Sequence, residues 1–249
     1  MVYLLTSLGY KVKILRALRF SLLSLLGKYI PGKIWIATMR STFFASEGVP
    51  VKTVLTSSVL ETVYMVFTAV ALYLISNKHL AGSLFLLQIT FGVLIILILA
   101  FVPGLVLSVL NMFFRRLGKE EIHHSFSTAN SMIISGLYIC NWTLQGLGVW
   151  ILANGMSAGL PPSALLMVTG AFAISVMAGF ITLFAPGGLG VREGMLALLL
   201  SSHIPIIKAA FIALAVRLAV SLAEILALAI LYLIQFVKKQ LRASMDLME

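Results

Sequence analysis

The sequence predicts an all-α fold: a polytopic bundle of helices embedded in a lipid bilayer. Hydrophobic residues make up 61% of the 249 residues and charged residues only 10%, whereas soluble domains carry about 25% charged residues. The apolar residues stand in continuous runs and not in the alternating pattern of barrel strands. Helices also satisfy their own backbone hydrogen bonds in lipid. We therefore expect one integral membrane domain over residues 1–249.

The first part of the chain predicts a surface segment followed by a broken helix. Residues 1–19 are basic and amphipathic, which is typical of a segment on the cytoplasmic face of a membrane. Residues 20–47 are apolar but are interrupted at Pro31 and Gly32. Each half is about half as long as the ~20 residues that a span requires. We expect a re-entrant pair of half-helices here.

The rest of the chain predicts plain spans and a second broken pair. The four apolar runs that we expect to cross the bilayer are 53–75, 84–110, 129–153 and 206–237. A basic loop, 111–128, connects the second and third of them. The run 164–204 is broken by a glycine-rich segment that begins at Pro186, so it predicts a second re-entrant pair.

The distribution of basic residues favours cytoplasmic N- and C-termini, because Lys and Arg are enriched on that side of a membrane. With both broken segments re-entrant, only Lys78 and Lys208 lie outside. The basic residues then placed inside are Lys11, Lys13, Arg16, Arg19, Lys52, Arg115, Arg116, Lys119, Lys238, Lys239 and Arg242. A complete crossing by residues 164–184 would place the basic C-terminal tail outside, so we favour the re-entrant alternative.

A shared spacing of prolines predicts an internal repeat. Pro50 follows Pro31, and Pro205 follows Pro186, at the same distance along the chain. Each second proline leads into a span that carries a charged residue. The two units cover about 14–75 and 164–237. The expected topology inverts one unit relative to the other, and inverted repeats with broken helices point to a transport site near the midplane. Coincidence is the alternative, since Pro and Gly are common in membrane helices.

The second break is the strongest candidate for a phosphate-binding site. The free N–H groups and the dipole at the start of a half-helix attract anions, and Gly187, Gly188 and Gly190 allow close approach to the backbone. Arg192 lies just beyond, and a guanidinium can bind phosphate through two parallel hydrogen bonds. Lys33 stands in the corresponding position after the first break. A purely structural break, with Arg192 and Lys33 reaching to the membrane surface, is the alternative.

Three charged residues, Glu61, Arg217 and Glu224, lie inside predicted spans. Each costs about 2.5–3.5 kcal/mol at a helix centre, so such residues face a cavity or pair with one another. A structural salt bridge, for example from Glu61 to Arg217 or Arg192, is as consistent with the sequence as a functional role. We count Arg217 among the lipid-binding candidates. The expected charge partners are Glu61, Glu193 and Glu224, and the weaker basic candidates are Lys28 and Arg40.

The sequence offers no sign of a catalytic or metal site. It contains no nucleophile elbow, zinc-binding helix motif or phosphate-binding P-loop, so we expect no metal, no cofactor and no enzyme activity. His123 and His124 are adjacent and point in different directions on a helix. The lone Cys140 excludes an internal disulfide framework. Positive-inside topology and anionic lipid headgroups explain the net charge of +10, so nucleic acid is not an expected partner.

Two segments resemble motifs of a known family: Leu26–Trp35 (LGKYIPGKIW) and Ala185–Gly194 (APGGLGVREG). The family is the flippase-like membrane domain family, which includes the transmembrane region of lysylphosphatidylglycerol synthase (multiple peptide resistance factor). The resemblance covers nearly the whole chain. It implies a multi-pass protein of a bacterial or archaeal inner membrane, with re-entrant helices and a role in lipid translocation.

The chain departs from that family pattern in two ways. The soluble aminoacyltransferase domain of the synthase is absent from the sequence, so the resemblance does not imply lysyl transfer. Family members also usually have one or two more spans before the first motif, so we expect that N-terminal spans are missing here.

Together these features predict a lipid flippase or transporter. Its substrate would be an anionic phospholipid or a polyprenyl-phosphate-linked lipid, bound through the headgroup phosphate. Two alternatives remain open at this point. One is an intramembrane lipid-modifying enzyme that uses Glu61, Glu193 or Glu224 as general base. The other is an accessory subunit that delivers lipid to a separate glycosyltransferase or synthase.

Overall fold

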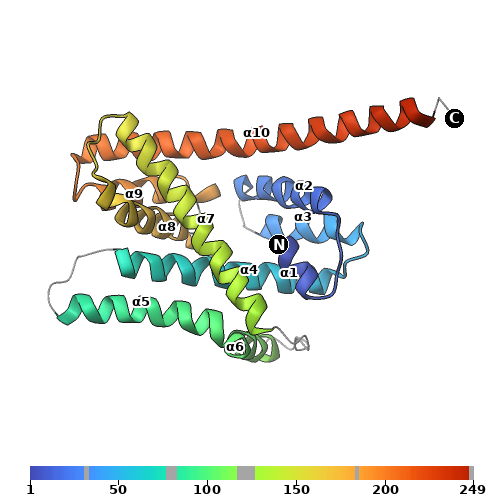
Figure 1. The fold of residues 1–249 in the computed structure, drawn as a ribbon, viewed down its shortest axis with the longest axis horizontal. Helices are drawn as coiled ribbons and strands as arrows, with labels where there is room; N and C mark the ends of the chain where they lie inside the picture. Colours follow the sequence, from blue (N-terminus) through green and yellow to red (C-terminus); the bar gives the residue numbers. More distant parts are fainter. Residues whose placement is uncertain (31–33, 77–82, 117–126, 183–184, 247–249) are drawn as a thin grey trace.

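The computed structural model confirms the all-α prediction. It describes the chain except residues 31–33, 77–82, 117–126, 183–184 and 247–249. Every regular element in the described residues is a helix (Figure 1). Five helices are long and apolar enough to cross a membrane, which makes this a multi-pass membrane protein. The candidate spans are Val51–Ser76, Leu84–Phe101, Thr128–Gly155, Pro162–Ile181 and Ile206–Ile234.

The main hydrophobic core lies where five helices meet. They are α4 (Val51–Ser76), α7 (Thr128–Gly155), α8 (Leu165–Ile181), α9 (Val191–Leu200) and α10 (Ile206–Asp246). The largest buried side chains of this core, Trp142 and Phe172, pack edge to face with ring centroids 6.4 Å apart. Many apolar side chains on α10 are exposed instead, such as Leu218 and Leu222. Lipid tails would cover such a surface.

The predicted span 84–110 is shorter than expected, and the following loop begins later. The structure divides this stretch into α5 (Ser83–Phe101) and α6 (Pro103–Arg116), with Val102 between them. Proline fixes its own backbone and disfavours a helical conformation in the residue before it. The helix therefore ends before Pro103, and residues 111–116 of the predicted loop are helical.

The carbonyl that this proline leaves unpaired is satisfied by neighbouring helices. In a continuous helix the N–H of residue 103 would donate to the carbonyl of Leu99, and proline has no N–H. The hydroxyl groups of Ser131 on α7 and Tyr64 on α4 donate to that carbonyl instead, and they also contact each other. This is how membrane proteins tolerate a proline break inside a bundle.

The N-terminal residues pack their apolar side chains into the protein. Helix α1 (Val2–Ser7) places Leu4 and Leu5 in two separate hydrophobic clusters, where they are 2% and 1% exposed. Leu4 packs with Leu60 and Tyr64 of α4. The apolar face of this segment is therefore covered by the helix bundle, and its placement at the cytoplasmic membrane surface stays a prediction.

The first broken segment forms a helix hairpin. Helices α2 (Ile14–Leu25) and α3 (Ile34–Ala45) are joined through a short 3-10 helix, η1 (Leu26–Tyr29). The ring of Phe20, in α2, stacks on that of Phe43, near the end of α3, at a centroid distance of 5.5 Å, so the two limbs are antiparallel. Each limb has 12 residues and is about 18 Å long, too short to cross a ~30 Å hydrocarbon core.

The second broken segment also forms a hairpin, of α8 and α9 joined through η3 (Pro186–Gly188). A Cβ atom on Gly188 would lie 2.7 Å from the Cα atom of Gly179, so the break packs directly on α8. Helix α8 belongs to a candidate span, which makes five candidates where the sequence predicted four. Both breaks are present, whereas their re-entrant placement in the bilayer and the inverted repeat stay predictions.

Candidate functional site

The breaks of the two hairpins lie against each other beside α10. A Cβ atom built on Gly187 of η3 would lie 3.7 Å from both the carbonyl oxygen of Lys28 and Cδ1 of Tyr29, in η1. From α10, Nη1 of Arg217 donates a hydrogen bond to the carbonyl of Gly187 at 3.0 Å. Residues far apart in the sequence thus converge at one place, which we call the junction. Its members are Lys28, Gly187, Arg192, Glu193, Arg217 and Glu224.

Arg217 is the most buried charge of the junction, at 8% exposed. Its Nε lies 3.5 Å from Oε1 of Glu193, which is an ion pair but too long for a good hydrogen bond. Its Nη2 is buried and has no hydrogen-bond partner among the described residues, and the same holds for Oε1 of Glu193. The sequence singled out Arg217, and the structure shows that its hydrogen-bonding capacity is not fully used.

Glu193 occupies the place where the sequence predicted a lipid phosphate. Its Oε2 accepts a hydrogen bond of 2.7 Å from the backbone N–H of Gly190, just before α9. A Glu at this third helical position is the usual partner in such a cap, and Gly190 supports it with a φ of 82°, a conformation that glycine adopts readily. In this structure the anion at the start of α9 is therefore a side chain of the protein itself.

Lys28 and Glu224 join the first hairpin to α10. The Nζ atom of Lys28 lies 2.5 and 2.6 Å from the two carboxylate oxygens of Glu224. Nearby, the guanidinium of Arg19 in α2 lies 5.1 Å from the ring centroid of Tyr232 in α10, a distance that allows a cation–π interaction. Lys28 was only a weak candidate from sequence, because nothing in the sequence indicated its partner.

Arg192 packs against α8. Its Cζ lies 5.0 Å from the ring centroid of Phe172, a cation–π contact. A Cβ atom on Gly179 would lie 3.1 Å from the Cβ of Arg192, so the base of this side chain is held closely against α8. The half-buried guanidinium is thus placed at the start of α9, beside Glu193 in the sequence.

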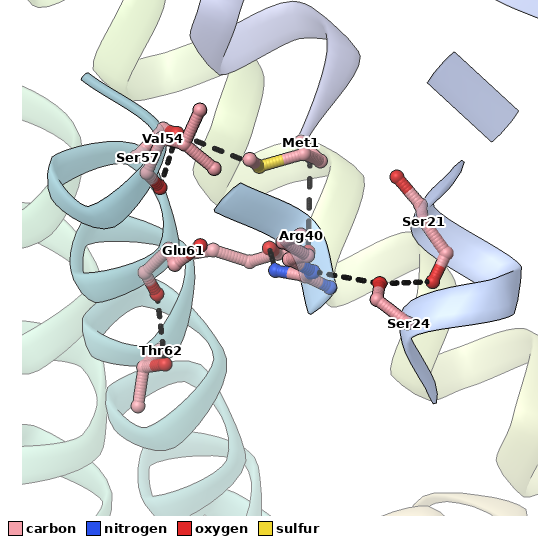
Figure 2. A network of polar contacts seen from close by, with 9 residues as sticks. Met1, Ser21, Ser24, Arg40, Val54, Ser57, Glu61 and Thr62 are labelled. Atoms are coloured by element: carbon pink, nitrogen blue, oxygen red, sulfur yellow. Dashed lines mark hydrogen bonds and ion pairs between the residues drawn. The ribbon is translucent and has the colours of Figure 1, made fainter. Parts of the chain in front are cut away.

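The charges of the first hairpin form a separate network, shown in Figure 2. Nη1 of Arg40, on α3, donates to Oε2 of Glu61, on α4. Nε of Arg40 donates to the hydroxyl of Ser24 at 3.3 Å, and the amino group of Met1 lies 3.7 Å from Glu61. Arg40 is only 8% exposed. A pairing of Glu61 with Arg217 or Arg192 is therefore wrong, since Arg40 holds that carboxylate.

The sequence model of one family, the lysylphosphatidylglycerol synthase TM region, matches residues 1–237. The chain belongs to this family. The match confirms the resemblance seen in the two broken motifs, and it concerns a membrane region, with no catalytic domain included. No curated protein and no solved structure matches the chain.

Some of the residues predicted from the sequence of this lysylphosphatidylglycerol synthase family member lie outside the part that the structure describes. Lys33, Pro31 and Gly32 lie outside the described residues, as do His123 and His124. Pro186 and Gly188 form the second break as predicted. Among the residues that the structure describes, no group of three or more His, Cys, Asp or Glu side chains lies together.

Proposed function

We propose that this protein is a flippase that moves an anionic phospholipid or a polyprenyl-phosphate-linked lipid across a prokaryotic inner membrane. The observation that carries the proposal is the buried guanidinium of Arg217. One of its nitrogens has no partner among the described residues and faces the break at Gly187. A buried, unsatisfied donor on a charged group is costly, and a phosphate oxygen would satisfy it. Membership of the lysylphosphatidylglycerol synthase TM region family supports a lipid as the source of that phosphate.

The charge balance of the junction fits a single phosphodiester. Lys28, Arg192 and Arg217 bring three positive charges, and Glu193 and Glu224 bring two negative ones. The site alone therefore has one excess positive charge in a membrane protein, where uncompensated buried charge is unfavourable. One phosphodiester anion would neutralise it, and Arg217 and Arg192 are placed to receive that anion.

Transport would follow from relative motion of the two hairpin units. We expect the units formed by α2–α4 and α8–α10 to rock against each other around the junction, as in other transporters with inverted repeats. Two contacts connect the units at that point: Lys28 pairs with Glu224, and Gly187 lies against the backbone of Lys28. These contacts would open and re-form as the headgroup passes.

Translocation in proteoliposomes tests the proposal. The substrates are fluorescent short-chain phosphatidylglycerol and a short polyprenyl phosphate. We expect the wild-type protein to move at least one of them and Arg192→Ala to be about tenfold slower, because a charged hydrogen bond contributes about 1.5–3 kcal/mol. Arg16→Ala is the matched control, since Arg16 is 54% exposed and pairs with Glu47 away from the junction.

Three results would change the proposal. Equal rates for wild type and Arg192→Ala would remove Arg192 from the mechanism. No movement of any anionic lipid would refute the transport function. Chemical conversion of the labelled lipid would point instead to an intramembrane enzyme.

A further inference from the structure

The start of α9 presents more hydrogen-bond donors than its one carboxylate satisfies in this structure. Three donors belong to this place: the N–H of Gly190 and the Nε and Nη2 groups of Arg217. Oε2 of Glu193 accepts from Gly190 at 2.7 Å. Oε1 lies 3.5 Å from Nε, and neither Oε1 nor Nη2 has a hydrogen-bond partner in the described part of the chain. Two of the three donors are thus poorly satisfied by Glu193.

The shape of the site explains why a side chain cannot do better. Glu193 is the third residue of α9, so its carboxylate can reach only as far as its side chain allows, and the two carboxylate oxygens lie in one plane. A phosphate carries its oxygens in a tetrahedral arrangement, so it can accept from a helix terminus and from the edge of a guanidinium formed by Nε and Nη2 at once. Gly187 lets Nη2 approach the break closely, since a Cβ atom there would lie 2.9 Å from Nη2.

We infer that Glu193 is a built-in competitor, which occupies the anion site of the junction until a phosphate group displaces it. The inference rests on the proposed function and adds a mechanism to it. The empty site keeps a counter-charge for Arg217, so a buried cation is not left alone between transport cycles. A bound phosphate gains only the difference between its own contacts and those of Glu193, which weakens binding and allows release. Glu193 thereby sets the affinity of the site.

Binding to the purified full-length chain in neutral detergent tests this role without requiring transport. The probes are short-chain phosphatidylglycerol and, separately, inorganic phosphate, titrated by calorimetry. Glu193→Gln removes the charge but keeps a side-chain oxygen that can cap Gly190. We expect it to bind phosphatidylglycerol at least about fivefold tighter than wild type, since the competing anion is gone. The control Glu47→Gln removes a carboxylate that pairs with Arg16 elsewhere and should leave affinity unchanged.

A second substitution shows whether the gain comes from the same site. Glu193→Gln combined with Arg217→Gln should lose the gain in affinity. Thermal unfolding reports whether each variant is folded. If Glu193→Gln does not fold, Glu193→Asp gives the same comparison. The shorter Asp side chain reaches Gly190 less well, so this variant should also bind phosphatidylglycerol more tightly than wild type. Tight binding of the lipid alone assigns the site to a headgroup, and tight binding of inorganic phosphate as well assigns it to phosphate in general; both support competition by Glu193.

The outcomes separate this inference from the transport proposal. A variant Glu193→Gln that binds phosphatidylglycerol no tighter than wild type would overturn the competitor role, even if wild type translocates lipid. Tighter binding by Glu193→Gln, with no translocation by any form of the protein, would support the competitor role and refute the flippase.

Discussion

Each of the two hairpins forms an ion pair with the long helix that follows it, but the acidic and basic residues are exchanged between the two pairs. In the first, Arg40 of the second limb pairs with Glu61 of the long helix that follows. In the second, Glu193 of the second limb pairs with Arg217 of the following helix. Each hairpin is thus fixed to its own long helix by a buried ion pair, with acid and base exchanged. This correspondence is what an internal repeat would produce after divergence of its two halves.

The two pairs differ in how completely they are satisfied. Arg40 donates directly to Glu61 and also to the hydroxyl of Ser24. Arg217 has a long contact of 3.5 Å with Glu193 and an unpartnered nitrogen within the described residues. A satisfied pair holds its elements together, whereas an unsatisfied pair can exchange one partner for a ligand. This difference supports our proposal that the second hairpin, and not the first, binds the substrate.

The largest expected effect comes from locking the two units together. A crosslink between Lys28→Cys and Glu224→Cys through a short, reducible bis-methanethiosulfonate reagent should abolish lipid translocation, because it joins the first hairpin to α10 across the junction. The background is Cys140→Ser, which has no other cysteine. Reduction should restore translocation. The rate of headgroup transfer in proteoliposomes is the measurement.

A crosslink within one unit, made with the same reagent, is the matched control. Phe20→Cys with Phe43→Cys joins α2 to α3, where the two wild-type rings stack 5.5 Å apart, and should leave translocation nearly unchanged. Transport by the crosslinked Lys28 and Glu224 variant would contradict the motion of one unit against the other.

The next largest effect compares the stability of the two ion pairs. Glu61→Ala leaves Arg40 as an uncompensated buried charge and should lower the free energy of unfolding by about 3 kcal/mol. Glu193→Ala should cost less, about 2 kcal/mol. It removes a helix cap and the counter-charge of Arg217, but the lost contact with Arg217 is a long one of 3.5 Å and Arg217 keeps its hydrogen bond to Gly187. Unfolding in mixed micelles measures both variants. Equal losses would remove the distinction between a structural and an exchangeable pair.

A smaller effect is expected from the glycines of the second break. Gly188→Ala places a Cβ atom 2.7 Å from the backbone of Gly179 at a φ of 70°, so it should destabilise the protein by about 2 kcal/mol through overpacking and backbone strain. Gly190→Ala meets open space, so only the backbone strain at its φ of 82° counts, and it should cost less, about 1 kcal/mol. Thermal unfolding of the two variants checks this order, and the reverse order would contradict the close packing of the break on α8.

The sequence predicted the features that depend on local chemistry. Apolar runs predicted membrane helices, and the Pro-Gly segments predicted both breaks. It also singled out Arg217 on the grounds that charges in apolar segments need partners, and it counted Glu193 among the expected charge partners. Pro103 was equally visible, but its consequence was underestimated, so the helix was expected to continue past Phe101.

Features that depend on tertiary contacts were missed. The partner of Glu61 is Arg40, on the second limb of the first hairpin, and no spacing rule relates the two positions. The burial of Leu4 and Leu5 depends on which surfaces α1 meets. The capping of Gly190 by Glu193 has a sequence signal, because an acidic residue three positions after a helix N-cap typically caps it. That pattern predicts a carboxylate at the anion site.

A structure determined with phosphatidylglycerol bound tests the central claim most directly, because it shows which anion lies at the junction. We expect the headgroup phosphate within hydrogen-bond distance of Nη2 of Arg217 and of the Gly190 N–H, with the carboxylate of Glu193 displaced from that N–H. A phosphate bound elsewhere, with Glu193 still capping Gly190, would contradict the account.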